Sequence, residues 1–298
     1  MSRLVLVPLD GSEFSESALP PAVTIAQRWN AGLEILIVHE SLPMLEYDLW
    51  PLASREWIED YIEKAATRIK EETGMTVSSM VLDGSPAEAI QNHAAAREAD
   101  LIVMATHGRG PMSRFWLGGT ADGLIRRSTI PILLLRPWEG AVGDQPEFRP
   151  RKVLVPLDGS DESEAILPHA VAVAGDCKTE FDILRVYPHA GSYGSSYLPH
   201  TVQLNADVLA EARSAATEYV EEKAEELVER GVSAIGSVVA DTGPAAGILH
   251  FAEKSGADLI AMSTHGRGGV SRLVLGSVTD KVIRGAQIPT LVHHPHDV

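Results

Sequence analysis

The chain has 298 residues, which is enough for two ordinary domains with separate hydrophobic cores. An apolar content of 45%, a charged content of 22% and a formal net charge of −16 are typical of a soluble acidic protein and argue against a nucleic-acid partner, which needs clustered Lys and Arg. Cys177 is the only cysteine, so we expect no disulfide within the chain. No apolar run approaches the length of a membrane span, and no charged-then-apolar leader follows Met1. We therefore expect a cytoplasmic protein without a membrane partner.

The first half of the chain alternates short apolar runs with amphipathic stretches. The apolar runs predict strands, and they lie at Leu4–Val7, Leu33–Val38, Val77–Leu82, Leu101–Ala105 and Ile130–Leu135. Helical spacing of apolar residues predicts helices that run from Ser15 to Trp29, from Trp57 to Ile69, from Pro86 onward and from Gly119 onward.

Several residues mark where these helices begin and end. Pro20 and Pro21 fit only in the first turn of a helix, and Gly74 lies where the helix from Trp57 should end. The sequence Ser-Pro-Ala-Glu at residues 85–88 predicts a capping box with proline at the first helical position.

The second half of the chain repeats the first. LVLVPLDGS at Leu4–Ser12 recurs as KVLVPLDGS at Lys152–Ser160, and THGRG at residues 106–110 recurs at residues 264–268. The offset is 148 residues for the first motif and 158 for the second, so the second copy has ten extra residues, which we place in the Gly- and Ser-rich segment 189–200. We expect domain 1 at residues 1–138, a linker at 139–150 and domain 2 at 151–298.

Apolar strands that alternate with helices predict an α/β fold whose parallel sheets are covered on both faces. Each repeat is therefore expected to be a doubly wound domain, Rossmann-like or flavodoxin-like, in tandem with the other. Ligands of such sheets bind beyond the carboxyl ends of the strands. The turns after the first and fourth strands of each repeat should therefore meet at one site.

The loop after the fourth strand combines a glycine-rich turn with a helix start. Gly108 and Gly118 bracket nine residues in the first repeat, and Gly266 and Gly276 do so in the second. Backbone N–H groups at a helix N-terminus favour phosphate, so the loop is a candidate phosphate site. The alternative is that the glycines only shape turns and that Ser277 is a helix N-cap with Asp280 completing a capping box.

Polar residues near these loops also have two interpretations. Asp10 and Asp158 either accept a hydrogen bond from a base or ribose or cap the following helix as Asx-turns. The arginines of the loops either meet phosphates or form a solvated basic surface; they are Arg109, Arg114, Arg267 and Arg272.

Histidines give little indication of catalysis or metal binding. His107 and His265 lack a partner in the sequence for acid–base chemistry, so we interpret them as structural or as ligand contacts. The terminal histidines 293, 294 and 296 have no acidic or cysteine companion, so no metal site is predicted.

The PLDGS turn, the THGRG turn and the LGS-type helix start, in this order, resemble the universal stress protein family in its tandem form. The resemblance covers essentially the whole chain, twice. It implies a five-stranded parallel sheet in each domain and, in the nucleotide-binding branch, bound ATP, with or without Mg²⁺. That branch is marked by G-x-x-G, nine residues and then G-[ST].

The resemblance gives a set of expected nucleotide-binding residues in each repeat. In the second repeat the motif falls on Ser263, Gly266, Gly276 and Ser277, adenine would contact Pro156, Asp158 and Val186, and the turn adds His265, Arg267 and Gly268. In the first repeat the set is Pro8, Asp10, Val38, Ala105, His107, Gly108, Arg109, Gly110, Gly118, Gly119 and Thr120.

The two sets are not equal. The first glycine of the motif is replaced in both repeats, by Ala105 and by Ser263, which are both small. In the second repeat Ser277 supplies the hydroxyl that follows the last glycine of the motif. In the first repeat Gly119 occupies this position, and Thr120 follows it. We expect ATP in both repeats and tighter binding in the second.

Three functions follow from these residues. The first is an ATP-binding stress-response regulator with an unidentified protein partner. The second is a slow ATPase or phosphoryl-transfer enzyme, against which we note the lack of a P-loop lysine and of paired catalytic residues; no catalytic residue is predicted. The third is a scaffold with vestigial pockets. From the resemblance we also expect the last strands of the two repeats to pair within the chain, and two chains to form a homodimer.

Overall fold

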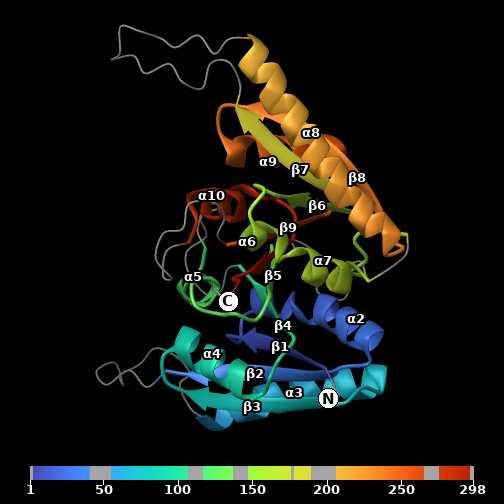
Figure 1. Ribbon diagram of the computed structural model, residues 1–298. Helices are drawn as coiled ribbons and strands as arrows, with labels where there is room; N and C mark the ends of the chain where they lie inside the picture. Colours follow the sequence, from blue (N-terminus) through green and yellow to red (C-terminus); the bar gives the residue numbers. More distant parts are fainter. Residues whose placement is uncertain are drawn as a thin grey trace, which may run out of the picture. The chain divides into compact units, whose positions relative to one another are not determined.

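The structure is a computed structural model that describes residues 3–40, 55–106, 117–136, 147–175, 178–188, 206–264 and 275–295. The chain divides into two compact units, one mainly of residues 1–148 and the other mainly of residues 149–291, and Val292–His296 are grouped with the first unit. We count β10 (Thr290–His293) with the second unit because it is the fifth strand of the second repeat. Within the described residues, each unit contains five strands that alternate with helices (Figure 1). The predicted α/β class is confirmed.

The first unit is built from residues that the apolar pattern largely anticipates. Its strands are β1 (Leu4–Leu9), β2 (Gly32–His39), β3 (Val77–Asp83), β4 (Leu101–Ala105) and β5 (Ile132–Leu135). Its helices are α1 (Glu13–Glu16), α2 (Leu19–Trp29), α3 (Arg55–Thr73), α4 (Pro86–Ala96) and α5 (Gly119–Ile125).

The second unit has the same sequence of elements. Its strands are β6 (Lys152–Pro156), β7 (Glu180–Pro188), β8 (Ser233–Asp241), β9 (Leu259–Ser263) and β10 (Thr290–His293). Its helices are α6 (Asp161–Glu164), α7 (Leu167–Ala174), α8 (Ala206–Glu229), α9 (Pro244–Ser255) and α10 (Ser277–Gly285).

The strand order makes each unit doubly wound. The order is β3-β2-β1-β4-β5 in the first unit and β8-β7-β6-β9-β10 in the second. The pairs β1–β2, β1–β4, β2–β3 and β4–β5 are parallel, and so are β6–β7, β6–β9 and β7–β8. The chain thus crosses from β1 to β3 in one direction and then returns to β4 and β5.

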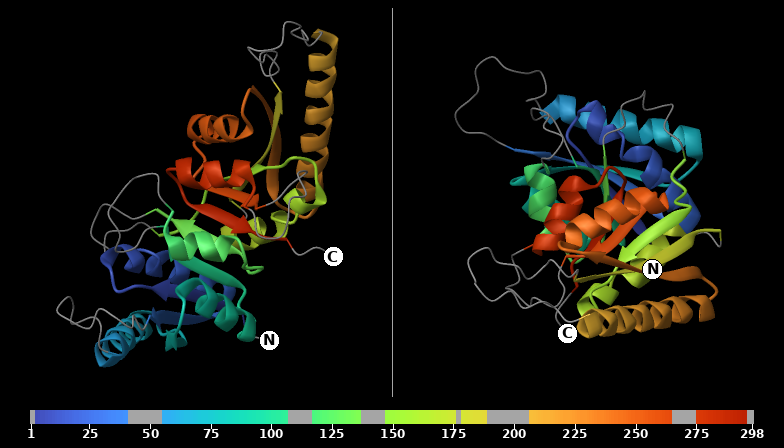
Figure 2. Two further views of the ribbon diagram at one scale, coloured as in Figure 1. Left: turned by 90° about the vertical axis from the view of Figure 1, so that its left-hand side faces the viewer. Right: turned by 90° about the horizontal axis from the view of Figure 1, so that it is seen from above.

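Helices cover both faces of each sheet because the direction of crossing reverses. With right-handed crossovers, α1 to α3 lie on one face and α4 and α5 on the other. Contacts agree with this, since α2 packs on β1 and β2, α3 packs on β2 and β3, and α4 contacts α5. In the second unit α9 contacts α10, and the long helix α8 packs along β7 and β8 (Figure 2).

The central strands supply the core of each unit. All five residues of β4 and all five of β9 are buried, as are Val5–Leu9 of β1 and Val153–Pro156 of β6. Burial on both faces explains why these strands read as continuous apolar runs and not as alternating ones.

The predicted boundaries needed three corrections. The helix expected from Ser15 is two helices, because Pro20 and Pro21 lack N–H groups and lie in the first turn of a new helix, α2. β5 begins two residues later than expected, at Ile132. Ser85 is the N-cap of α4, but its side chain makes no capping hydrogen bond.

Other local predictions are confirmed. Gly74 ends α3 and has a φ of +68°, which favours glycine. The placement of all ten extra residues in the segment 189–200 is wrong in part, because the helix α8 has 24 residues and its counterpart α3 has 19, so some of the extra length is helical. The segment 189–200 lies outside the described residues, and so does most of the predicted linker.

No helix within the described residues is both long and apolar enough to cross a membrane.

Candidate functional site

The candidate site lies at the carboxyl ends of the two central strands in each unit. β1 pairs with β4 through Val5 with Leu101, and the chain leaves these strands toward opposite faces of the sheet. The same relation holds for β6 and β9. Such a point, where the strand order reverses, is where doubly wound proteins bind ligands.

A tight Asx-turn follows β1. The Oδ1 atom of Asp10 accepts hydrogen bonds from the Ser12 backbone N–H at 2.9 Å and from the Ser12 hydroxyl at 2.6 Å. Gly11, between them, has a φ of +77°. The buried hydroxyl of Ser15 donates to the Ser12 carbonyl at 2.8 Å and thereby fixes the turn to α1.

The second unit repeats this turn after β6. Oδ1 of Asp158 accepts from the Ser160 backbone at 3.1 Å and from the Ser160 hydroxyl at 2.5 Å, and Gly159 has a φ of +75°. The Ser163 hydroxyl donates to the Ser160 carbonyl at 2.8 Å. The Asx-turn predicted for both aspartates is therefore confirmed for Oδ1, but the N-caps of α1 and α6 are Ser12 and Ser160 and not the aspartates. An ionised carboxylate has a second oxygen, so the turn does not preclude a ligand contact.

A glycine begins the helix on the other side of the site. The Gly118 N–H donates to the Thr106 carbonyl at 2.9 Å, and the Gly276 N–H donates to the Thr264 carbonyl at 3.0 Å. Each bond joins the start of the helix to the end of the central strand. Gly118 and Gly276 are the N-caps of α5 and α10.

The alternative in which Ser277 is an N-cap is wrong. Ser277 is the first residue of α10, its side chain is exposed, and the cap is Gly276. Asp280 forms no capping box, since its carboxylate accepts from Arg284 Nε at 2.9 Å. The glycine takes the cap because its backbone bonds to the strand end, and this leaves the Ser277 hydroxyl on the outside of the first turn.

Two hydroxyl hydrogen bonds distinguish the second unit from the first. The Thr279 hydroxyl donates to the Ser263 carbonyl at 3.0 Å, and the Ser263 hydroxyl donates to the Ser163 carbonyl at 3.4 Å. The first unit has Ala121 and Ala105 at the equivalent positions. Thr279 was not among the predicted site residues, because no local sequence pattern links it to the end of β9. The one signal in the sequence is the difference between the repeats, which have Thr279 and Ala121 at equivalent positions.

The residues expected to face adenine lie at the same sheet edge. Pro8 and Pro156 are buried in β1 and β6. Val38 and Val186 are half-buried near the ends of β2 and β7. The Val186 side chain packs against α9, because a Cβ on Gly247 would lie 3.1 Å from Val186 Cγ1.

The residues of the glycine-rich turns lie outside the described residues. They are His107, Gly108, Arg109, Gly110, His265, Gly266, Arg267 and Gly268, together with Arg114 and Arg272. The described part of each site therefore consists of the Asx-turn, the ends of the strands and the glycine-capped helix.

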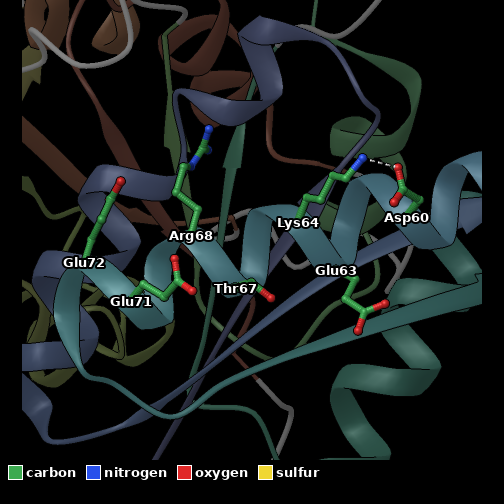
Figure 3. Close-up of a pocket in the computed structure, with 7 residues that line it drawn as sticks. All are labelled: Asp60, Glu63, Lys64, Thr67, Arg68, Glu71 and Glu72. Carbon is green, nitrogen blue, oxygen red and sulfur yellow. Dashed lines mark hydrogen bonds and ion pairs between the residues drawn. The ribbon is translucent and has the colours of Figure 1, made fainter.

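A surface hollow on α3 is a different feature. It measures about 370 Å³, and its lining residues, shown in Figure 3, all belong to this one helix: Asp60, Glu63, Lys64, Thr67, Arg68, Glu71 and Glu72. Lys64 pairs with Asp60 at 2.6 Å, and both side chains are largely exposed. Mixed charges on an exposed helix face are typical of solvated surface, so we assign no ligand to it. Among the residues that the structure describes, no group of three or more side chains is suited to hold a metal ion.

Comparisons with known proteins agree with this architecture. A sequence model of the family described as "Universal stress protein family" matches residues 1–136 and again residues 150–294. A universal stress protein of Mycobacterium tuberculosis is 28% identical over 297 residues, which cover 97% of this chain and 96% of the relative. One from Methanocaldococcus jannaschii is 35% identical over 140 residues, which cover 45% of this chain and 82% of the relative.

A solved structure is also similar over the whole chain. The crystal structure of a universal stress protein from Archaeoglobus fulgidus has a TM-score of 0.70 at 21% sequence identity, covering 100% of this chain and 98% of that chain. At this identity the likeness supports the fold alone.

Proposed function

The chain belongs to the universal stress protein family, and from that premise we propose that both of its repeats bind ATP in a stress-response role, the second repeat more tightly. The nucleotide would lie at the sheet edge between the Asx-turn and the glycine-capped helix. Adenine would meet Pro156, Asp158 and Val186, or Pro8, Asp10 and Val38, and the phosphates would meet the loop and the helix start.

The observation that carries this proposal is the glycine cap beside the central strand. Gly276 is the N-cap of α10, and the first backbone N–H groups of that helix have no carbonyl partner within the helix. Such groups, together with the helix dipole, favour an anion. The Asx-turn of Asp158 lies at the carboxyl end of the neighbouring strand, on the other side of the same switch point.

The expected difference in ATP affinity between the two repeats rests on one hydroxyl and on the length of the capped helix. Ser277 stands at the first position of α10, which has 9 residues, and Gly119 stands at the first position of α5, which has 7. A hydrogen bond to a charged phosphate contributes about 1.5–3 kcal/mol, so we expect the second repeat to bind ATP roughly tenfold or more tightly.

Calorimetric titration of the full chain with ATP tests both claims. We expect two binding sites of unequal affinity. Ser277→Gly should weaken the tighter site, and Gly119→Ser should strengthen the weaker one, because a Cβ at Gly119 meets no atom within 4 Å. Two equal sites in the unmodified chain, or no response to either exchange, would contradict the asymmetry.

The two other functions predict different outcomes. A slow ATPase would release phosphate in a purified sample and would lose this activity in Gly276→Val. A scaffold with vestigial pockets would show only unliganded chain in native mass spectrometry, even after addition of ATP.

The assembly proposal is separate from nucleotide binding. We propose a homodimer, as the family resemblance implies, and light scattering of the full chain measures its mass directly.

A further inference from the structure

We infer that Thr279 and Ser263 are positioning residues that couple the two halves of the second nucleotide site, and that the first site lacks this coupling. The inference rests on the proposed function and deepens it. It concerns how firmly the phosphate side of the site is held against the side that would contact adenine and ribose.

The second unit contains a chain of hydroxyl hydrogen bonds across the switch point. The Thr279 hydroxyl on α10 donates to the carbonyl of Ser263, the last residue of β9, at 3.0 Å. The Ser263 hydroxyl donates to the Ser163 carbonyl on α6 at 3.4 Å. From there, Ser163 donates to the Ser160 carbonyl at 2.8 Å, and Ser160 donates to Oδ1 of Asp158 at 2.5 Å.

The path therefore joins the first turn of α10 to the Asx-turn of Asp158. Its two members at the helix end are shielded from water, since Ser263 is 5% and Thr279 is 4% exposed. Hydrogen bonds in such an environment are stronger than exposed ones. The Gly276 N–H adds a second bond between α10 and the strand end, at 3.0 Å to Thr264.

The first unit has the two links at the Asx-turn end of this path and lacks the two at the helix end. Ser15 donates to the Ser12 carbonyl at 2.8 Å, and Ser12 donates to Oδ1 of Asp10 at 2.6 Å. Ala105 and Ala121 stand where Ser263 and Thr279 stand, and they have no hydroxyl. The backbone hydrogen bond from Gly118 to Thr106 still links α5 to the end of β4. It corresponds to the bond from Gly276 to Thr264 in the second unit.

The consequence is a difference in preorganisation. A site whose donors are held in place before the ligand arrives loses less free energy in ordering them. The Thr279 hydroxyl holds the start of α10 against the end of β9. Loss of this hydroxyl should therefore weaken the binding of the phosphates first, and it should lower the ratio of ATP affinity to adenosine affinity.

The test uses the full chain and compares ATP with adenosine by calorimetry. We expect Thr279→Val to weaken ATP binding at the tighter site about two- to tenfold, the effect of one lost hydrogen bond, and to leave adenosine binding there nearly unchanged. Thr279→Ser keeps the hydroxyl and should restore ATP affinity. Thr217→Val is the matched control, since it removes a hydroxyl that donates to a backbone carbonyl on α8 at 2.9 Å.

The possible outcomes are distinct. A purely structural role would lower the unfolding midpoint of Thr279→Val and leave the ratio of ATP to adenosine affinity unchanged, and this would overturn the inference. Equal loss of affinity in Thr279→Val and Thr279→Ser would also overturn it. If the unmodified chain binds no ATP, the proposed function itself fails; if it binds ATP and Thr279→Val binds it equally well, only the inference fails.

Discussion

The Tyr219 hydroxyl donates a hydrogen bond to Oε1 of Glu164 at 2.7 Å, and Tyr61 donates in the same way to Glu16 at 2.7 Å in the first unit. Each bond joins the long helix after the second strand to the one-turn helix after the first. Burial, with the neighbouring glutamate, raises the pKa of both tyrosines. Each tyrosine–glutamate hydrogen bond therefore stabilises the position of the one-turn helix that follows the Asx-turn.

Removing this hydroxyl should destabilise the second unit. We expect Tyr219→Phe to lower the free energy of unfolding by about 1–2 kcal/mol, because Glu164 then loses a partly buried donor. Urea unfolding followed by fluorescence measures the change. Glu164→Gln is the control, since it keeps an acceptor for the tyrosine and should have a smaller effect. An unchanged urea midpoint in Tyr219→Phe would show that the bond contributes nothing.

Gly276 should tolerate a side chain less well than its counterpart Gly118. A Cβ at Gly276 would lie 2.7 Å from the Thr264 carbonyl oxygen, and a Cβ at Gly118 would lie 3.3 Å from that of Thr106. We expect Gly276→Ala to destabilise the chain by about 1–3 kcal/mol and to abolish tight ATP binding, with a smaller loss for Gly118→Ala. Thermal unfolding and calorimetry on both variants measure this. Gly119→Ala is the control for stability alone, because a Cβ there meets no atom within 4 Å, and it should not lower the unfolding midpoint.

The two roles of Asp158 can be separated by paired substitutions. Asp158→Asn keeps an oxygen that can accept from Ser160, so the turn should persist with a stability change below about 1 kcal/mol. Asp158→Ala removes the acceptor and should lower stability by about 1–3 kcal/mol.

Nucleotide affinity then reveals the second role. If the carboxylate also contacts base or ribose, Asp158→Asn should weaken ATP binding at the tighter site while its unfolding midpoint stays near that of the unmodified chain. Equal affinities in these two proteins would restrict Asp158 to the turn.

Asp182 should make the stability of the second unit depend on pH. This β7 carboxyl is 1% exposed, its Oδ2 lies 3.6 Å from Lys152 Nζ, and within the described residues its Oδ1 has no hydrogen-bond partner. Burial raises its pKa above the ordinary value of 3.8, although a hydrogen bond with Ser237 and the Lys152 charge oppose the rise. The folded state therefore favours the protonated carboxyl.

The sign of the effect follows from this shift. The favourable contribution of Asp182 is complete below its unfolded-state pKa and is lost as the pH rises through the folded-state pKa. Asp182→Asn removes that loss. The free energy of unfolding of this variant, relative to that of the unmodified chain, should therefore increase as the pH rises above the ordinary carboxyl pKa of 3.8. Urea unfolding across this range measures it, and a difference that stays flat with pH would contradict the assignment.

The first unit supplies a contrasting control. Glu34, at the equivalent position of β2, is buried with His93, with Ser78 at 3.2 Å and with Arg97 at 3.1 Å as partners. Glu34→Gln should destabilise the chain at pH 7, because it removes the buried anion that accepts from Arg97 and contacts His93. The opposite directions for Glu34 and Asp182 would show that partners, and not burial alone, determine the effect.

Much of the fold was predictable from the sequence because its signals are local. A short continuous apolar run such as Leu101–Ala105 is typical of a strand buried on both faces, and the structure has β4 at those residues. Gly74 and the proline at position 86 mark helix ends through their own backbone preferences. The duplication was visible by comparing the chain with itself.

The sequence by itself determined the alternation of strands and helices, the repeat and the sheet edge where the two motifs meet, since these depend on residue types at short spacing. Tertiary structure decided what the polar side chains do there. Asp158 bonds within its own turn, Gly276 and not Ser277 caps α10, and Ser263 reaches Ser163, which is 100 residues away in the chain. A hydrogen bond between residues so distant exists only after β6 and β9 pair, so no local pattern could have predicted it.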